Sequence, residues 1–353
     1  MHRNMASGRS SVSVSVVTHN SSRFIRNCLQ YILAQDYSSF EVTVVDNAST
    51  DDTRQVLREF ERRVHVVYNS ENVGFAAAHN QAIGYSNADW FLVLNPDVRL
   101  MPDFITMMVA AGESDVSVGS VSGKLLRMSP DFEVPARPIL DSTGIYFTPS
   151  LRHFDRGSGE PDRGRYEQFE YVFGVTGAAA LYRRRMIDNI SIIGEFFDLD
   201  FFAYREDADV AWRAQLLGWK CLYTPHAVAY HVRSVLPSNR RSTAPLVNMH
   251  SVKNRFLMRI KDITANLYLR HFLAITTRDC LVIAGCLFGE FSSLRAFLFI
   301  FRNLRRIWVK RRQIMQRRRA TDVYLAAWFA SQPVSYPAPE LAARLQAQQT
   351  AGR

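Results

Sequence analysis

"FEVTVVDNASTDDT" (residues 40–53) reads as a buried strand that ends on a charge. Val44 and Val45 are apolar and β-branched, which favours a strand, and Asp46 follows them directly. Small polar residues come next and predict a turn. In open α/β sheets, ligands bind beyond the carboxyl ends of the parallel strands. The stretch therefore predicts an α/β fold in which Asp46 lies where such folds bind their ligands.

The same alternation extends over the first hundred residues. Strands are predicted at 12–18, 40–46, 64–69 and 90–95, with helices at 23–34, after residue 50 and at 74–86. Strands that alternate with helices of about ten residues are typical of βαβ units and a mostly parallel sheet.

Three of these strands end in polar residues. "THN" (18–20) ends the first strand, Asp46 the second, and "NPD" (95–97) the fourth. Because the carboxyl ends of parallel strands meet at one edge, we expect Thr18, Asn20, Asp46 and Asn95 to converge on one crevice. Alternatively, each is an ordinary turn residue, since Asn and Asp are common in turns.

Asp97 follows a buried strand and is placed to hold Mg²⁺ or Mn²⁺, which take carboxylate oxygens and share the ion with substrate phosphates. His231 ends a later strand and is a further candidate ligand, preferred over His226, although a lone histidine is commonly structural. Gly74 begins a helix whose backbone N–H groups can face a phosphate. The sequence contains no P-loop and no GxGxxG after a strand, which argues against a dinucleotide oxidoreductase.

"YREDADVAWR" (204–213) places Glu206, Asp207 and Asp209 at the start of a helix predicted at 206–217. Acids at a helix N-terminus complement its dipole, and Asp209 can pair with Arg213, so a purely structural interpretation exists. Three acids within four residues also repel one another. Such crowding raises a carboxyl pKa, as a general base requires.

The middle and the end of the chain have different compositions. Residues 125–170 are rich in proline and glycine and predict a long, irregular and mobile excursion over the active face. A strand follows within 171–184, and one or two strands within 221–231. A helix is predicted at 247–263. The apolar segments 280–289 and 294–301 are both shorter than the roughly 20 residues that span a bilayer.

A dense basic run follows these apolar segments. It contains Arg302, Arg305, Arg306, Lys310, Arg311, Arg312, Arg317, Arg318 and Arg319. An apolar stretch beside such a run predicts a helix lying in the interface of an anionic leaflet. The alternative is a buried core helix with a solvated basic face. A nucleic-acid-binding protein would also use such a run, but aromatic interleaving and a binding motif are missing, so no nucleic acid partner is expected.

The bulk composition sets the remaining expectations. With 353 residues and 47% hydrophobic content, most of the chain should be globular with a sizeable core. The cysteines form no CxxC pair, which predicts free buried thiols in a reducing cytoplasm, and no secretion signal is expected at the N-terminus. We expect a leader (1–11), a catalytic domain (12–235), a helical basic extension (236–325) and a tail (326–353) that is loose from residue 331.

Taken together and in order, "VSVSVVTHN", "FEVTVVDNASTDDT", "NVGFAAAHNQAI", "WFLVLNPDV", "GAAALYRR" and "FFAYREDADVAWRAQLLGWK" resemble the family 2 glycosyltransferases, above all the bacterial rhamnosyltransferase branch. The resemblance covers about residues 12–260. "VKNRFLMRIKD" also looks like the helical segment that follows the catalytic domain in that branch.

The resemblance implies a GT-A fold, Rossmann-like with a mostly parallel sheet flanked by helices, and a C-terminal helical extension. The apolar segments and the basic run of that extension predict that it associates with a membrane. It also implies inverting, Mg²⁺- or Mn²⁺-dependent transfer from a nucleoside diphosphate sugar. dTDP-rhamnose is favoured, with galactofuranosyl or mannosyl transfer as alternatives. The acceptor would be a glycan or a polyprenyl-linked glycan of the cell surface, and the protein would be cytoplasmic and peripheral on the inner membrane face.

The resemblance also implies roles for individual residues. Asp207 would be the catalytic base and Glu206 its acidic neighbour. Asp97 would occupy the last position of the family's DxD motif. The motif is Asn95-Pro96-Asp97 here, so its first acid is missing. Binding of the nucleotide sugar would fall to Thr18, Asn20, Asp46, Asn72, Gly74, Asn80 and Asn95.

Overall fold

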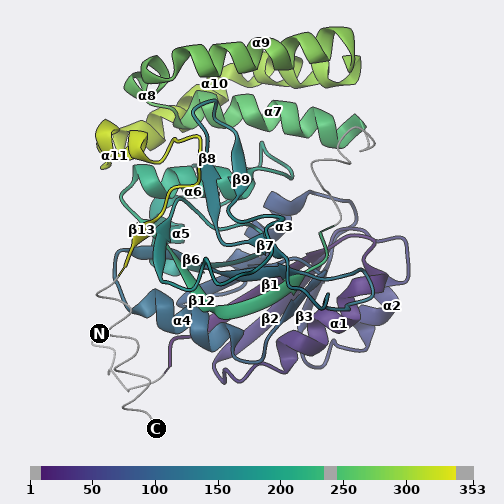
Figure 1. Ribbon diagram of the computed structural model, residues 1–353. Coiled ribbons are helices and arrows are strands. Elements are labelled where there is room, and N and C mark those ends of the chain that lie inside the picture. Colours follow the sequence, from purple (N-terminus) through teal and green to yellow (C-terminus); the bar gives the residue numbers. More distant parts are fainter. Residues whose placement is uncertain (1–8, 234–244, 339–353) are drawn as a thin grey trace, which may run out of the picture.

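The computed structural model describes residues 9–233 and 245–338 (Figure 1). Its body is an eleven-stranded sheet with the order β13-β10-β12-β6-β11-β4-β1-β2-β3, to which β5 and β7 attach at β12 and β6. Helices cover the sheet, and a stack of C-terminal helices lies beyond it at one end of the molecule (Figure 1).

The first half of the sheet is parallel, as predicted. β1 pairs in parallel with β2 and β4, and β2 pairs in parallel with β3. The elements are β1 (Val12–Thr18), α1 (Ser22–Leu33), β2 (Phe40–Asp46), α2 (Thr53–Arg58), β3 (His65–Tyr68), α3 (Phe75–Gly84) and β4 (Trp90–Leu94).

The alternation in β1 explains how this half is built. Val12, Val14 and Val16 are fully buried in one of the two hydrophobic clusters. On the opposite face of the strand, the Ser15 hydroxyl lies 2.8 Å from Nδ1 of His79 in α3. Apolar residues on one face and small polar residues on the other fix the register of the strand, because a slip by one residue would exchange the two faces.

The second half of the sheet is mixed, so the expected mostly parallel arrangement holds only for the first half. β11 is antiparallel to both β4 and β6, whereas β12 is parallel to β6 and antiparallel to β5 and β10. The elements are β5 (Val98–Leu100), α4 (Phe104–Glu113), β6 (Val118–Arg127), β10 (Glu170–Val172), β11 (Ala179–Arg183), α5 (Arg184–Ile190), α6 (Glu206–Leu216) and β12 (Lys220–His231).

The segment 125–170 consists mostly of loops and turns, as predicted, but it also includes short strands that were not predicted. It contains β7 (Leu140–Ser142), which pairs with β6, and the hairpin of β8 (Ile145–Phe147) and β9 (His153–Asp155). Each of these strands is three residues long, too short for a periodic pattern to appear in the sequence. Their positions depend on contacts with distant strands.

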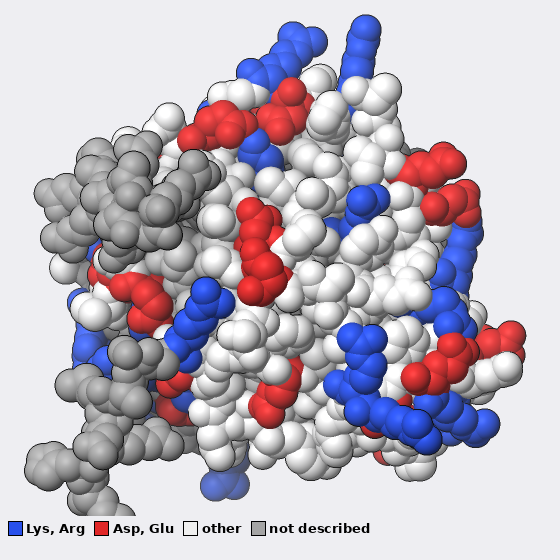
Figure 2. Space-filling view, turned by 90° about the horizontal axis from the view of Figure 1, so that it is seen from below, with Lys and Arg blue, Asp and Glu red and all other residues white. Residues whose placement is uncertain are grey.

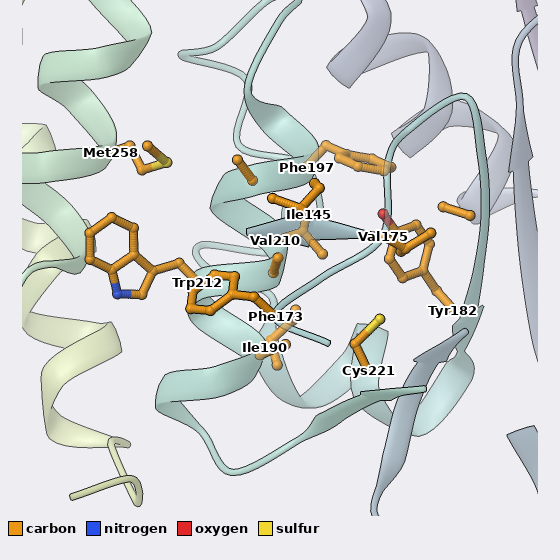
Figure 3. Packing of buried hydrophobic residues seen from close by; sticks show 14 of the residues in the cluster. Ile145, Phe173, Val175, Tyr182, Ile190, Phe197, Val210, Trp212, Cys221 and Met258 are labelled. Atoms are coloured by element: carbon orange, nitrogen blue, oxygen red, sulfur yellow. The ribbon is translucent and has the colours of Figure 1, made fainter. Parts of the chain in front are cut away.

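The C-terminal helices pack on α6 and on each other. They are α7 (Pro245–Asp262), α8 (Ala265–Arg270), α9 (Phe272–Phe288), the 3₁₀ helix η2 (Phe291–Leu294), α10 (Arg295–Gln316) and α11 (Asp322–Ala327). Figure 3 shows Trp212 of α6 directed toward the side of the core where Met258 of α7 lies, and both belong to the same buried cluster. Among the helices described, none has the length and apolar character needed to cross a membrane.

Much of the basic run serves the interior of the protein. Lys310 is buried and binds Asp198 (2.5 Å) and Asp200 (3.1 Å). Other members bind carboxylates or backbone carbonyl groups of neighbouring segments, namely Arg306, Arg311, Arg317 and Arg318. These paired bases therefore hold α10 and the residues that follow it to the rest of the molecule, which leaves only part of the run for an external partner.

Two smaller expectations are also corrected. Cys280 is exposed on α9, whereas Cys28, Cys221 and Cys286 are buried, and all four thiols are free. The tail is not loose from residue 331, because β13 (Tyr336–Pro337) pairs with β10 and the Ala338 N–H donates to the Phe169 carbonyl group. The rest of that tail (339–353) and the leader up to residue 8 lie outside the described residues.

Candidate active site

The ends of β1 and β2 present two polar atoms without hydrogen-bond partners among the described residues. Thr18 and Asp46 are register partners, and both are fully or almost fully buried. Oδ2 of Asp46 accepts from Nε of Arg54 (2.7 Å) and from the Ser49 N–H (3.2 Å). Oδ1 of Asp46 and the Thr18 hydroxyl have no partner. Buried polar atoms are normally paired, so this pair is suited to a polar ligand.

Asn20 and Asn72 shape the loops around these atoms. Asn20 adopts a left-handed conformation (φ 51°), and its Oδ1 accepts from the Thr50 N–H (2.8 Å). Oδ1 of Asn72 accepts from the Gly74 N–H (3.0 Å) at the start of α3. These contacts fix the two loops that flank the end of β2.

α3 packs closely against the segment before α6, at Gly74 and at Asn80. Gly74 has φ +88°, and a Cβ there would lie 2.6 Å from Cδ2 of Phe202, so the position requires glycine. Asn80 donates from Nδ2 to the Phe197 carbonyl group (2.7 Å) and accepts on Oδ1 from the Phe197 N–H (3.0 Å). The Asn80 amide is thereby engaged at both ends by the backbone of Phe197.

Asp207 lies beside the end of β4. The Asn95 N–H donates to the Ala178 carbonyl group (2.9 Å), and the neighbouring Gly177 N–H donates to Oδ2 of Asp207 (3.0 Å). The Ala208 N–H donates to Oδ1 of the same carboxyl group (2.7 Å). The first turn of α6 and the end of β4 are thus joined through one short segment of chain.

The two acids that begin α6 have raised pKa values. Glu206 is buried, and its burial, followed by the charge of Asp207, raises its pKa to about 8. Burial also raises the pKa of Asp207, although its hydrogen bond from Gly177 opposes the change, and the charge of Asp155 adds to it. The predicted effect of crowded acids is therefore present, with burial as the larger cause.

Asp209, the third acid, instead forms buried ion pairs that stabilise the fold. Its Oδ2 accepts from Nε of Arg213 (2.8 Å), as the spacing predicts, and its Oδ1 lies 2.7 Å from Nζ of Lys261 in α7. All three side chains are fully buried. The third acid of the motif therefore fastens α6 to the C-terminal helices.

Asp97 and His231 lie together because β5 pairs with the end of β12, with Val98 opposite His231. Nε2 of His231 is 3.4 Å from Oδ1 of Asp97, and its Nδ1 is 2.8 Å from Oδ2 of Asp141. Burial lowers the pKa of His231, but its hydrogen bond to Asp141 and the nearby carboxylate of Asp97 outweigh this effect and raise the pKa to about 10. His226, the alternative ligand, is exposed on the bulge in β12.

Asp97 and His231 are suited to bind a divalent cation, but they supply only some of the ligands that the cation needs. The described part of the chain has no cluster of three or more His, Cys, Asp or Glu side chains arranged to hold a metal. Oδ1 of Asp97 is buried and accepts no hydrogen bond, and Asp141 holds the far nitrogen of His231, as outer carboxylates do in metal sites. Mg²⁺ and Mn²⁺ commonly need few protein ligands because substrate phosphates supply the others.

The sequence analysis missed Asp141, Asp155 and Arg233. Nη1 of Arg233 lies 3.0 Å from Oδ1 of Asp141, and Nη2 of Arg233 binds Asp155. Asp155 is also close enough to Asp207 to affect its pKa. The two acids come from the segment 125–170, and only the folded sheet brings them to the end of β12, so the sequence carried no signal for them.

Two surface hollows lie away from this edge of the sheet. One has a volume of about 540 Å³ and is lined by Arg185, Asp188, Asn189, Trp219 and Arg319. The other, of about 150 Å³, is lined by residues of β10, β12, β13 and α11 together with Gln215 and Trp328. Neither includes the acids at the strand ends, so the chemistry of the side chains, not these cavities, locates the candidate site.

Comparison with known proteins gives one family match and several relatives. The model of "Glycosyl transferase family 2" matches residues 13–191. The "Putative teichuronic acid biosynthesis glycosyltransferase TuaG" of Bacillus subtilis is 34% identical over 95 residues, which are 26% of this chain and 38% of TuaG. The "N-acetylglucosaminyl-diphospho-decaprenol L-rhamnosyltransferase" of Mycobacterium tuberculosis is 27% identical over 237 residues, which are 62% of this chain and 75% of that protein.

One solved structure similar to the chain is a mannosyltransferase from Pyrobaculum calidifontis in complex with GDP-Man and Mn²⁺. It is 19% identical, with a TM-score of 0.49 over 88% of this chain and 86% of that chain. The match to TuaG spans less than two thirds of that relative's length.

Proposed function

Because the chain belongs to glycosyl transferase family 2, we propose that it transfers a sugar from a nucleoside diphosphate donor to an acceptor hydroxyl group, with inversion at the anomeric carbon. The observation that best supports this activity is the pair of buried, unpartnered polar atoms at the ends of β1 and β2, on Thr18 and Asp46. A ribose hydroxyl or a base N–H would satisfy the Asp46 oxygen. Asn20, Asn72, Gly74 and Asn95 belong to the loops around the same edge and complete the proposed donor site.

Asp207 is the proposed catalytic base. Its carboxylate takes the proton from the acceptor hydroxyl group as that oxygen attacks the anomeric carbon from the face opposite the diphosphate. The bond to the diphosphate breaks as the new glycosidic bond forms, so one base suffices and no covalent glycosyl intermediate is needed. The Gly177 and Ala208 N–H groups hold the carboxylate in place (3.0 and 2.7 Å). Glu206, with its raised pKa, is the acidic neighbour.

Asp97 and His231 are the proposed protein ligands of Mg²⁺ or Mn²⁺. When bound, such an ion neutralises negative charge on the diphosphate leaving group. Asp141 orients His231 through Nδ1, which leaves Nε2 directed toward Asp97. His231 must lose its ring proton for this role, so metal affinity should rise with pH.

For the donor we propose dTDP-rhamnose, supported by the Mycobacterium tuberculosis relative, whose name specifies L-rhamnosyl transfer. Galactofuranosyl and mannosyl transfer remain the alternatives. The proposed acceptor is a glycan or polyprenyl-linked glycan of cell-surface polysaccharide synthesis, at the inner face of the cell membrane. The names of the Mycobacterium and Bacillus relatives support this class of acceptor.

A donor panel tests the proposal directly. Thermal unfolding is followed with dTDP-rhamnose, UDP-galactofuranose, GDP-mannose and ATP, each with Mn²⁺ and with EDTA. We expect one nucleoside diphosphate sugar to raise the melting temperature by several degrees in Mn²⁺, and ATP to have no effect. A chain that none of the sugar nucleotides stabilises, and that hydrolyses or transfers none of them, would contradict the proposed activity.

A further inference from the structure

The outermost C-terminal helix, α9, exposes an apolar face. Leu273 (77% exposed), Leu281 and Phe288 (86% exposed) are seven or eight residues apart, which places them on one side of the helix. Figure 1 shows α9 at the edge of the molecule farthest from the sheet. On its inner side, Asp279 is buried and binds Arg255 and Arg259 of α7, so the orientation of α9 is fixed.

α10 adds a mixed apolar and basic stripe. Its residues at intervals of three and four are exposed in the order Leu298, Phe301, Arg305, Trp308 and Arg312. α10 contains no acidic residue. The side of α10 that carries Ile307, Lys310 and Ile314 is buried.

The charges on this stripe are uncompensated. Arg302, Arg305 and Arg312 are exposed and form no ion pair with any described residue, whereas Arg306 and Lys310 on the same helix are paired with Asp200. The structure therefore divides the basic run into a part that serves the interior and a part that faces outward. On the face opposite α9, by contrast, basic and acidic side chains are interspersed (Figure 2).

We propose that the outward residues of α9 and α10 form a docking surface for an anionic lipid bilayer. This membrane surface consists of Leu273, Leu281, Phe288, Leu298, Phe301, Arg302, Arg305, Trp308 and Arg312. The apolar side chains enter the boundary between headgroups and acyl chains, and the arginines bind lipid phosphates. Arginine and tryptophan suit this position because each combines an apolar body with a polar end.

No described helix is long and apolar enough to cross a bilayer. The inference rests on the proposed function in one respect, namely that a lipid-linked acceptor is presented at a bilayer. α7 lies beneath this surface and contacts both α10 and α6, which connects the membrane surface to the helix that carries Asp207.

Co-sedimentation of the whole protein with vesicles tests the docking surface without donor or acceptor. We expect binding to vesicles of phosphatidylcholine and phosphatidylglycerol (7:3), weakening as salt is raised, and little binding to phosphatidylcholine alone. Replacing Arg302, Arg305 and Arg312 by Gln should lower the partition coefficient on the order of a hundredfold. F288E/F301E should lower it about tenfold or more.

The controls come from the first third of the chain, outside the C-terminal helices. R62Q/R63Q removes two exposed arginines and V116E removes an exposed apolar side chain, and both should bind vesicles like the unchanged protein. Equal vesicle binding by the controls and the α9–α10 variants would overturn the proposal. So would light scattering that shows a dimer converted to a monomer by F288E/F301E, because a second copy would then cover the surface. Donor binding, measured in parallel, reports separately on the proposed function.

Discussion

Nδ2 of Asn254 in α7 donates to the carbonyl oxygen of Tyr204 (2.7 Å), two residues before Glu206. The same nitrogen lies within 3.0 Å of the carbonyl oxygens of Phe201 and Ala203. Phe202, Tyr204 and Arg205 all have positive φ, which is unfavourable for residues other than glycine. One fully buried amide of the C-terminal helices thus holds the strained loop that leads into the proposed catalytic base.

Replacing Asn254 by Ala should therefore affect both stability and catalysis. We expect a loss of about 2–4 kcal/mol in the free energy of unfolding, because buried carbonyl groups lose their donor. The turnover number should fall by about tenfold or more, because small displacements of catalytic groups are costly. Urea unfolding and initial rates measure the two effects.

Asn303, whose amide donates to the Phe299 carbonyl group of its own helix (2.8 Å), is the matched control, and N303A should change little. A rate unchanged in N254A would show that the loop does not depend on this amide.

Lys261 is expected to be the most sensitive position of the buried ion network. It is fully buried and binds both Asp198 and Asp209. Replacing it by Met leaves each of these acids with fewer cationic partners, and we expect a loss of about 3–5 kcal/mol in the free energy of unfolding. The exposed pair of Arg23 and Asp131 (2.6 Å) is the control, since R23M should cost at most ~1 kcal/mol. Similar losses in both variants would contradict a special role for the buried network.

Asp207→Asn should abolish transfer while preserving donor binding. A missing general base lowers the rate by roughly 10²–10⁴-fold. Asn keeps one acceptor oxygen, so it can retain one of the two hydrogen bonds that Asp207 accepts from Gly177 and Ala208, and the fold should persist. Initial rates and calorimetry with the donor distinguish the two effects, and D188N, at an exposed acid on α5, is the control. Turnover within threefold of the unchanged protein would remove Asp207 from this role.

The metal site predicts a graded response. Asp97→Ala should eliminate the increase in donor affinity caused by Mn²⁺. Asp141→Asn should reduce Mn²⁺ affinity by about 10–100-fold, because the residue acts through His231. Calorimetry with the nucleoside diphosphate, in Mn²⁺ and in EDTA, measures both. If the affinity of D97A responds to Mn²⁺ as that of the unchanged protein does, the ion is bound elsewhere.

Glu206 should make the protein less stable as pH rises. Its pKa in the folded state is about 8, above the ordinary value of 4.5, so the folded state retains a proton that the unfolded chain has lost. Its contribution to stability is therefore fully present below about pH 4.5 and declines as pH rises to about 8 and beyond. At about 1.4 kcal/mol per pKa unit, the decline has an upper limit of ~5 kcal/mol.

Glu206→Gln should remove this part of the decline. Urea unfolding at pH 5 and at pH 8.5 should show a smaller difference for E206Q than for the unchanged protein. E71Q, at an exposed glutamate, is the control and should retain the full difference. Parallel stability curves for E206Q and the unchanged protein would show that Glu206 titrates near its ordinary pKa.

The sequence patterns were sufficient to predict the strands of the parallel half of the sheet, but not those of the mixed half. β1 and β2 combine apolar runs with polar ends, and their predicted bounds are those observed. β6 is buried on both faces, so it shows no alternation between apolar and polar residues. β5 and β7 are only three residues long and depend on pairing with distant strands.

The same limit applies to the site and to the basic run. Asp46, Asp97 and Asp207 stand at strand or helix ends, where local patterns identify them. Asp141 reaches His231 across 90 positions of sequence, a contact that no local pattern encodes. Which bases of α10 are paired depends on Asp198 and Asp200, which are more than 100 positions away. Local sequence patterns therefore identified these candidate residues, whereas only the folded structure shows which residues are their partners.

The buried pairing of Asp198, Asp209 and Lys261 has a consequence for protein engineering. A fragment cut near residue 235 would leave Asp198 without Lys261 and Lys310, and Asp209 with Arg213 alone. A chimera that joins it to the C-terminal helices of a relative would need matching charges at the junction. A swap between homologues should therefore transfer the N-terminal part and the C-terminal helices together.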